Sequence, residues 1–186
     1  MTASATDRPD ALARARRGDQ AAFEELMRMH QRQVLLTSLR LLGRMEDAQD
    51  AAQEAFLKLY RNLRIFGSLA EIRPWLYRVS VNVCHDLARK RGLLAAEAPG
   101  PDVPVEDGGD ERIGLEQQRV LLAEALTYLP EKERAAIVLR EIEGLDTDEV
   151  AAILGSTPAT VRTQVSTGRA RLRSIVTRLS RRKHEL

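Results

Sequence analysis

The sequence predicts an all-α protein made of two small helical domains joined by a flexible acidic linker. Apolar residues recur three, four or seven positions apart, whereas alternating β-branched and aromatic runs between turn residues do not occur. With 186 residues, 44% hydrophobic and 30% charged, the chain has the composition of a folded protein. A segment rich in proline, glycine and acids divides it, which predicts domains over 1–91 and 114–186 and a linker over 92–113.

Charge is distributed unevenly along the chain, although the formal net charge is only +2. Residues 1–91 carry 16 basic and 11 acidic side chains, and residues 113–186 carry 12 and 10. Residues 92–112 carry 1 basic and 6 acidic side chains. Two basic parts therefore flank an acidic one. We interpret the acidic segment as a solvated tether, and the alternative is that it mimics the charge of nucleic acid.

The N-terminal part contains three predicted helices. The first covers 20–42 and stops at Gly43, the second covers 46–63, and Pro74 can open the third because a first-turn proline loses no intrahelical hydrogen bond. The apolar positions of the first two are Phe23, Leu26, Met27, Val34, Leu35, Leu41, Leu42, Ala52, Phe56, Leu59, Tyr60 and Leu63.

The surface of the second helix carries an acidic and polar patch with one leucine in it. Its residues are Asp50, Gln53, Glu54, Leu57 and Arg61. A solvated helix face is the usual explanation of such charges. An exposed leucine framed by carboxylates also suits docking against a basic helical partner, and the residues alone leave both interpretations open.

The third helix has two apolar faces, which predicts packing on two sides. The main face consists of Trp75, Leu76, Val79, Val83 and Leu87, and the weaker one of Tyr77, Val81, Cys84 and Ala88. An open polar stripe separates them, made of Arg78, Asn82, His85 and Arg89. Trp75 lies where the stripe meets the main face, so it can be a core residue whose exposed edge supports a nucleic-acid surface.

The C-terminal part has the layout of a helix-turn-helix. After predicted helices over 115–129 and 131–143, a short helix runs over 146–154, and Thr157 caps a long one that begins at Pro158. The long helix buries Val161, Val165, Leu172, Val176 and Leu179. From residue 162 to 183 there are eight basic residues and no acid, which favours phosphate binding over a two-helix hairpin with a solvated cationic face.

Several classes of function are disfavoured by the sequence. No glycine-rich phosphate loop occurs, and His30, His85 and His184 lack metal-ligand spacing, so we expect neither an enzyme nor a metal or other cofactor. A single cysteine, Cys84, fits a reducing compartment. No segment resembles a signal peptide, and the run VLLTSLRLL is too short to span a bilayer, so a cytoplasmic protein without membrane insertion is expected.

Three separated motifs together resemble a known family. EDAQDAAQEAFLKLYRNL, then PWLYRVSVNVCHDLARKR, then LPEKERAAIVLREIEGLDTDEVAAILGSTPATVR look like the extracytoplasmic-function sigma factors of bacterial RNA polymerase. The resemblance covers roughly residues 12–91 and 115–180. It implies a subunit that binds core polymerase, through its β′ and β subunits, and promoter DNA, and it implies an anti-sigma protein as a further partner. A helix-turn-helix regulator that binds only duplex DNA is the alternative.

The resemblance also implies site residues. For polymerase binding these are Asp50, Gln53, Glu54 and Leu57, with Phe56 as buried support. The loop from Gly67 to Arg73 would capture a flipped base of the minus-ten element, and the full set for that element is Ser68, Glu71, Arg73, Trp75, Arg78, Asn82 and Arg89. For the minus-thirty-five element the set is Thr160, Arg162, Thr163, Ser166, Thr167 and Arg169.

The long C-terminal helix departs from the family pattern at three positions. Gln164, Thr167 and Gly168 stand where Arg, Arg and Ala are usual. Two charges are lost, and a glycine inside a helix costs about 1 kcal/mol relative to alanine. We expect the binding mode to persist, with Arg169, Arg171 and Arg173 holding phosphates, but the usual upstream sequence does not follow.

Overall fold

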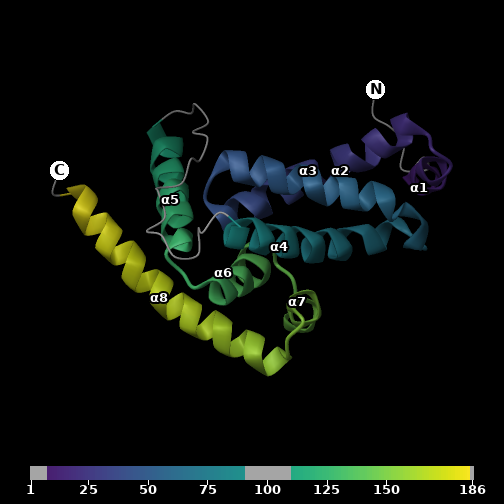
Figure 1. The fold of residues 1–186 in the computed structure, drawn as a ribbon. Coiled ribbons are helices and arrows are strands. Elements are labelled where there is room, and N and C mark those ends of the chain that lie inside the picture. The colour runs from purple at the N-terminus through teal and green to yellow at the C-terminus, as the bar shows by residue number, and fades with distance from the viewer. Residues whose placement is uncertain (1–7, 91–109, 185–186) are drawn as a thin grey trace.

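The computed structural model describes residues 8–90 and 110–184, and all its regular elements there are helical. Figure 1 shows a bundle formed by the N-terminal helices and a second group of helices from the C-terminal part. The elements are α1 (Arg8–Arg16), α2 (Gln20–Leu42), α3 (Met45–Arg61), η1 (Leu63–Ile65), η2 (Leu69–Glu71), α4 (Ile72–Lys90), α5 (Asp110–Thr127), α6 (Glu131–Ile137), η3 (Val138–Ile142), α7 (Thr147–Leu154) and α8 (Pro158–His184). The predicted all-α fold is confirmed.

The N-terminal bundle packs α2 against α3 and α4, with α1 across the end of α2. Asp19 caps α2 by accepting a hydrogen bond from the amide of Ala22 at 3.1 Å, and Gly43 ends the helix with a φ of 78°. Both boundaries agree with the sequence prediction. Leu26, Leu59 and Leu76 are fully buried at the centre of this bundle.

Two details differ from the sequence prediction. Helix α4 begins at Ile72, so Pro74 lies within its first turn rather than at its first position. Tyr60 belongs to the predicted apolar positions of α3, but it is not buried with the others, because 53% of its surface is exposed. It lies near the end of α3, where Phe23 stacks edge-on against its ring, with the centroids 5.0 Å apart.

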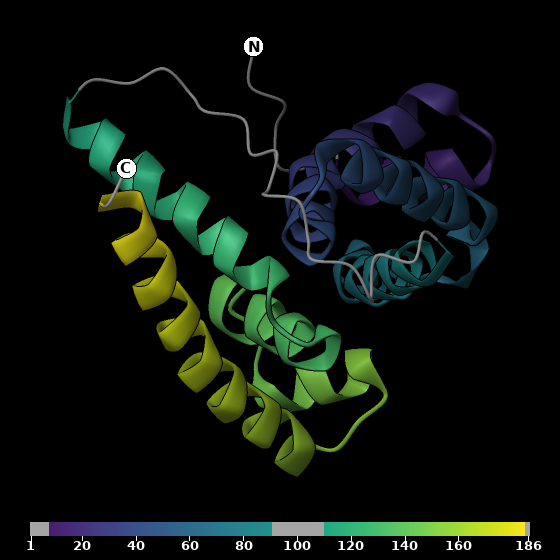
Figure 2. The same ribbon diagram turned by 60° about the vertical axis from the view of Figure 1, so that its left-hand side comes forward.

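The C-terminal domain is organised around α8, which packs against α5, α6 and α7. In Figure 2 these helices lie along one side of α8. Asp146 and Glu149 form a reciprocal capping box at the start of α7, and Gly155 ends that helix with a φ of 59°. Thr157 then caps α8 through the amide of Thr160 at 3.2 Å. Helix α5 begins at Asp110, so the last residues of the predicted linker are helical, and 91–109 lie outside the described residues.

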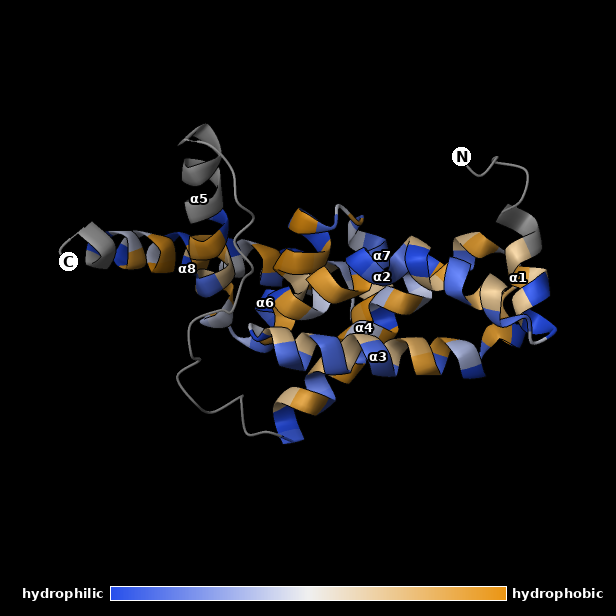
Figure 3. Cartoon of the chain, turned by 90° about the horizontal axis from the view of Figure 1, so that it is seen from above, coloured by the Kyte–Doolittle hydropathy of each residue, from blue (hydrophilic) through white to orange (hydrophobic). Residues whose placement is uncertain are grey.

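The two domains share one apolar cluster. Leu41 and Tyr77 of the N-terminal domain belong to the same cluster as Leu126, Leu139 and Val150 of the C-terminal domain. Helix α7 packs on α4, and α5 and α6 pack on α2. In Figure 3, apolar residues recur along these helices. The weaker apolar face predicted on α4 is thus explained, because Tyr77 and Cys84 belong to the cluster that includes residues of the second domain.

Candidate nucleic-acid and protein interfaces

The polar patch of α3 is on the surface, as the sequence predicted. Asp50 and Gln53 are exposed, and Glu54 is half-buried with its carboxylate 4.0 Å from Lys58 Nζ. Leu57 is 44% exposed, whereas the adjacent Phe56 is only 6% exposed and packs in the bundle core. An apolar side chain is therefore offered to solvent within a polar surface, which is a feature of protein-binding sites.

The loop before α4 is organised by a carboxylate. Glu71 accepts a hydrogen bond from the amide of Gly67 at 2.9 Å and another from the hydroxyl of Ser68 at 3.2 Å. Both Ser68 and Glu71 remain exposed. Glu71 therefore holds the loop shape, and one predicted site residue positions another.

The polar stripe of α4 is exposed along much of its length. Arg78 and Asn82 are exposed, and Arg89 forms a surface ion pair with Asp86 at 3.2 Å. Trp75 is half-buried against Phe66, with ring centroids 5.3 Å apart and the planes nearly perpendicular at 89°. The structure places the tryptophan at the border that the sequence predicted, packed on one side and accessible on the other.

The helix-turn-helix presents the first part of α8. Arg162 and Thr160 are exposed, and so is Ser166; the hydroxyl of Thr160 lies 2.9 Å from that of Thr157. The hydroxyl of Thr163 donates to the carbonyl of Ala159 at 3.1 Å, which leaves its acceptor lone pairs toward solvent. Arg162 takes part in no ion pair within the described residues.

Three predicted residues further along α8 are less available. Thr167 is half-buried. Arg169 forms an ion pair with Glu141 at 2.5 Å, and Arg171 forms one with Glu133 at 3.3 Å. These ion pairs join α8 to α6 and η3, so two of the three arginines expected to hold phosphates also serve the packing of the domain.

Gly168 is explained by helix packing. It is buried where α8 crosses α6, and a Cβ atom at this position would lie 3.0 Å from Ile137 Cγ1 and 3.4 Å from Glu133 Cβ. The missing side chain lets the two helices approach closely. The departure from the family pattern at this position thus reflects the core and not the DNA-facing surface.

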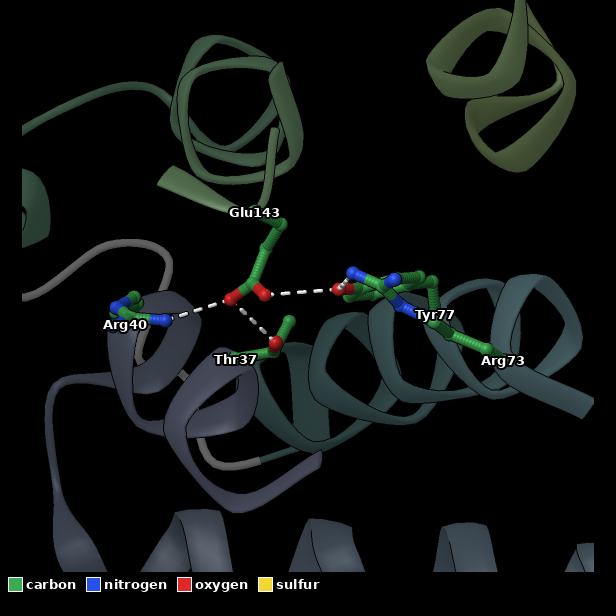
Figure 4. Close-up of polar contacts among 5 residues, drawn as sticks. All are labelled: Thr37, Arg40, Arg73, Tyr77 and Glu143. Atoms are coloured by element: carbon green, nitrogen blue, oxygen red, sulfur yellow. Dashed lines mark hydrogen bonds and ion pairs between the residues drawn. The ribbon is translucent and has the colours of Figure 1, made fainter. Parts of the chain in front are cut away.

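A largely buried carboxylate that the sequence did not single out joins the two domains (Figure 4). Glu143 directly follows the π-helical turn η3. Its amide donates to the carbonyl of Val138, the first residue of that turn, at 2.9 Å. Its carboxylate accepts hydrogen bonds from Arg40 at 2.6 Å, Thr37 at 2.9 Å and Tyr77 at 2.9 Å. We call this group, Glu143 with its three donors, the Glu143 clasp.

The clasp reaches a predicted promoter-binding residue. Arg73 donates to the hydroxyl of Tyr77 at 3.3 Å and lies over its ring, 5.6 Å from the centroid. Burial raises the pKa of Tyr77, so its hydroxyl keeps the proton that it donates to Glu143. Arg73, at the start of α4, is thereby linked through one side chain to the C-terminal domain.

A second polar contact crosses the domain interface. Arg134 of α6 donates to the carbonyl of Leu41 at 2.5 Å, and also to the carbonyls of Thr127 at 2.7 Å and Leu129 at 2.9 Å. Burial lowers the pKa of Arg134, and the three carbonyl dipoles offset part of the cost of burying its charge. A third contact starts from the polar stripe of α4, where Nε2 of His85 lies 3.0 Å from Oε1 of Glu131 in α6.

Other kinds of site find no support in the part of the chain that the structure describes. No group of three or more histidine, cysteine, aspartate or glutamate side chains gathers there as a metal would require. None of the described helices combines the length and apolar character needed to cross a bilayer. Cys84 is buried, and this raises the pKa of its thiol to about 12.

Family models match both halves of the chain. Residues 26–93 match Sigma-70 region 2, and residues 119–172 match Sigma-70, region 4. The first covers the polar patch, the loop and α4, and the second covers the helix-turn-helix.

Curated relatives with similar sequences are sigma factors. The chain is 37% identical over 175 residues to the ECF RNA polymerase sigma factor SigE of Mycolicibacterium smegmatis, covering 88% of this chain and 66% of that protein. It is 32% identical to the ECF RNA polymerase sigma factor SigW of Bacillus subtilis, covering 87% of this chain and 92% of that protein. It is 33% identical to the ECF RNA polymerase sigma-E factor of Escherichia coli K12, covering 91% and 94%.

Two solved structures share the fold. CnrH in complex with the cytosolic domain of CnrY aligns with a TM-score of 0.64 and 26% identity, covering 90% of this chain and 95% of that one. The sigma factor RpoE in complex with the anti-sigma factor NepR, from Bartonella quintana, aligns with a TM-score of 0.68 and 22% identity, covering 83% and 96%. With both region models in order and relatives matched over most of their length, the chain belongs to the extracytoplasmic-function sigma factors of RNA polymerase.

Proposed function

We propose that this sigma factor directs transcription initiation through three surfaces, each formed by the residues that the sequence pointed to. The patch on α3 binds core RNA polymerase, the loop and stripe of α4 bind the opened minus-ten element, and the start of α8 reads the minus-thirty-five element. The observation that carries the proposal is that these three surfaces are exposed together on one chain, although its domains are packed against each other.

Polymerase binding is supported by the contrast between Leu57 and its surroundings. An exposed leucine flanked by Asp50, Gln53 and Glu54 offers an apolar anchor with a polar rim, the usual anatomy of a protein interface. Acidic side chains around the anchor suit a basic partner surface, and complementary charge speeds association. The β′ subunit would meet this patch, and β would meet the C-terminal domain.

Opening of the minus-ten element is supported by the arrangement of Trp75 and the stripe. The half-buried indole and the guanidinium of Arg78 provide flat surfaces for unstacked bases, and Asn82 and Arg89 provide donors along the same face. The loop around Ser68 and Glu71 would take one flipped base, with Arg73 beside it. Binding of that base offsets part of an unpairing cost of a few kcal/mol.

Recognition of the minus-thirty-five element is supported by the first two turns of α8. Arg162 can pair with a guanine edge, and Thr160, Thr163 and Ser166 can bond phosphates or bases. Thr167 and Arg169 belong to the same proposed set, but Arg169 would have to break its ion pair with Glu141 in order to bind DNA. Exchange of one partner for another makes its net contribution smaller than that of Arg162.

We further propose an anti-sigma protein as a regulatory partner, in line with the complexes that the two similar structures contain. The predicted boundaries, 1–91 and 114–186 with a linker over 92–113, allow the domains to separate when polymerase and DNA bind. The chain would act in the cytoplasm by binding alone, without catalysis and without a cofactor.

Run-off transcription tests this function. Sigma-free core polymerase and a set of candidate promoter fragments are incubated with and without the purified chain, and transcript ends are mapped. A sigma factor gives RNA that starts at a discrete site and depends on the chain. Duplex DNA binding without any chain-dependent transcript, over a broad set of promoters, would instead identify a helix-turn-helix regulator.

A further inference from the structure

A pocket of about 290 Å³ lies where α1 meets the end of α3 and η1. Four arginines from these elements and the turn after α1 line it, and the rest of the wall is Tyr60 together with small or apolar residues. These arginines are Arg16, Arg17, Arg61 and Arg64, and we call the site that they line the arginine pocket. No acidic residue contributes to the lining, so the pocket is strongly cationic.

The charge of the arginine pocket is not neutralised within the described residues. None of its four guanidinium groups forms an ion pair there, and Arg16 only donates through Nε to the carbonyl of Leu63 at 3.2 Å. The acid that follows Gly18 in the chain is Asp19, and Arg14 already binds its carboxylate at 2.7 Å. Four like charges gathered around one hollow leave an anion as the natural occupant.

An aromatic ring stands at the same place. Tyr60 is 53% exposed although it lies in a well-packed helix, and the edge-on contact with Phe23 fixes the orientation of its ring. Sites that bind single-stranded nucleic acid combine two components. Cationic side chains follow the phosphate backbone, and exposed aromatic rings stack on the bases. The ring thus points to a nucleotide strand rather than to a simple anion.

The arginine pocket adjoins the loop proposed to capture the flipped base. Leu63 and Arg64 belong to η1, which packs against α1, and η2 of the capture loop packs against α1 as well. Only Phe66, Gly67 and Ser68 separate η1 from η2 in the chain. A strand held by the capture loop therefore has the pocket beside it.

We propose that the arginine pocket binds a backbone phosphate of the single-stranded promoter DNA next to the minus-ten element, while a neighbouring base stacks on Tyr60. The proposal rests on the sigma function proposed above. A volume of 290 Å³ is at the lower limit of pockets that enclose a whole small ligand, about 300–1,000 Å³. It suits one phosphate of a continuous strand better than an enclosed free nucleotide.

The test measures how tightly the holoenzyme binds a fluorescein-labelled single strand that carries the minus-ten element and its flanks, by anisotropy at several salt concentrations. The main variant is Arg17→Ala with Arg64→Ala, since both side chains are exposed. Arg17→Lys with Arg64→Lys keeps the charge. The matched control is Arg28→Ala with Arg32→Ala, a pair of exposed arginines on α2 outside every proposed site.

The alanine pair should bind the strand more weakly. The slope of its log binding constant against log salt concentration should become less negative by about 0.7 for each phosphate that no longer has an arginine partner. The lysine pair should keep most of the slope, and the α2 control should behave as the wild type. Tyr60→Ala should weaken binding by about 5- to 160-fold, the range for removal of one stacking partner. All variants should bind core polymerase as the wild type does, which shows that they are folded.

An unchanged affinity and slope in the alanine pair would overturn the proposal while the wild type still initiates transcription, so the sigma function would stand. If the wild type neither binds core polymerase nor initiates, the failure lies in that function instead. Tight binding of ATP to the wild type, abolished in the alanine pair while its DNA slope stays unchanged, would assign the pocket to a free nucleotide and also overturn the proposal.

Discussion

Leu57 and Phe56 are neighbours in α3 with opposite environments, 44% and 6% exposed, and this contrast defines the proposed polymerase-binding surface. Phe56 maintains the bundle, whereas Leu57 contributes little to it. A substitution at residue 57 can therefore remove binding without unfolding the domain.

Leu57→Arg should weaken binding to core polymerase at least tenfold, because a positive charge replaces the apolar anchor and opposes a basic partner surface. Titration of core polymerase into the labelled chain measures the affinity. Met29→Arg is the matched control, since Met29 is 43% exposed on α2 outside the patch. Equal affinities for Leu57→Arg and the wild type would remove Leu57 from the interface.

Arg162→Ala should weaken binding to a minus-thirty-five duplex by about 1–3 kcal/mol, because an exposed arginine at the start of a reading helix can pair with a base edge. A mobility-shift assay with the full chain measures the change. Lys132→Ala, an exposed cation on α6, should leave the affinity within twofold. A decrease of the same size for both variants would show a nonspecific charge effect.

His30 gives the fold a dependence on pH. Burial, and then the charge of Arg73, lowers its pKa below 6.5, and Nε2 has no hydrogen-bond partner among the described residues. The unfolded chain therefore takes up a proton as pH falls below about 6.5 while folded His30 stays neutral, so the free energy of unfolding decreases there.

His30→Gln should remove that part of the pH dependence. Urea midpoints at pH 7.5 and pH 5.5 should differ less in the variant than in the wild type. The same decrease in stability in both proteins would assign the effect to other groups.

At the scale of elements, Gly168 lies where α8 crosses α6, a contact that could not be predicted from the sequence. A Cβ atom there would already lie 3.0 Å from Ile137 Cγ1 and 3.4 Å from Glu133 Cβ, so the larger side chain of valine would have to displace these neighbours. Gly168→Val should reduce the free energy of unfolding by about 1–3 kcal/mol, the usual cost of overpacking. Ala170→Val, on the exposed side of α8, is the matched control and should change it by less than about 1 kcal/mol. Urea unfolding of both variants measures the difference, and equal stabilities would show that the crossing can adjust to a side chain.

Most helices were predictable because their signals are local. Asp19 and Gly43 at the ends of α2, and Asp146, Gly155 and Thr157 around the turn of the helix-turn-helix, act through bonds to residues close in sequence. The three proposed surfaces were predicted at the residue level, and the structure shows most of their members exposed. The family resemblance supplied their roles, since exposure alone does not name a partner.

Other elements lacked a local signal. Among its described side chains, helix α1 buries a narrow stripe of Ala11, Leu12 and Ala15 within a highly charged segment, so its periodicity is weak. The π-helical turn before Glu143 inserts one residue without any mark in the apolar pattern. Tyr60 fits the apolar spacing of α3, but it is 53% exposed, whereas Leu59 and Leu63 beside it are buried.

At the scale of the whole molecule, the packing of the two domains depends on contacts between residues about a hundred positions apart. Glu143 meets Thr37 and Arg40, and Arg134 meets the carbonyl of Leu41. Nothing near Glu143 in the sequence identifies these partners. The second apolar face of α4 was the one visible sign that another domain would cover it.

Glu143→Ala should loosen the domain interface, because Arg40 and Tyr77 lose their shared acceptor while partly or fully buried. Cys84 reports the change, since it is the single cysteine and lies in the apolar cluster that both domains share. Its thiol should react slowly with a disulfide reagent at pH 8 in the wild type and several-fold faster in the variant. Glu24→Ala, which removes a carboxylate of α2 outside the clasp, should react as the wild type does.

Equal rates for Glu143→Ala and the wild type would show that the apolar cluster holds the domains together without the clasp. Global unfolding is separated from domain opening by circular dichroism, because opening retains the helices.

Association with the polymerase is the step on which every proposed role depends. The most direct measurement is the equilibrium binding of the purified full-length chain to sigma-free bacterial core polymerase, followed by fluorescence anisotropy. Saturable one-to-one binding, displaced by a known sigma factor, is the predicted result. A chain that shows no association at any accessible concentration, while still binding duplex DNA, would contradict it.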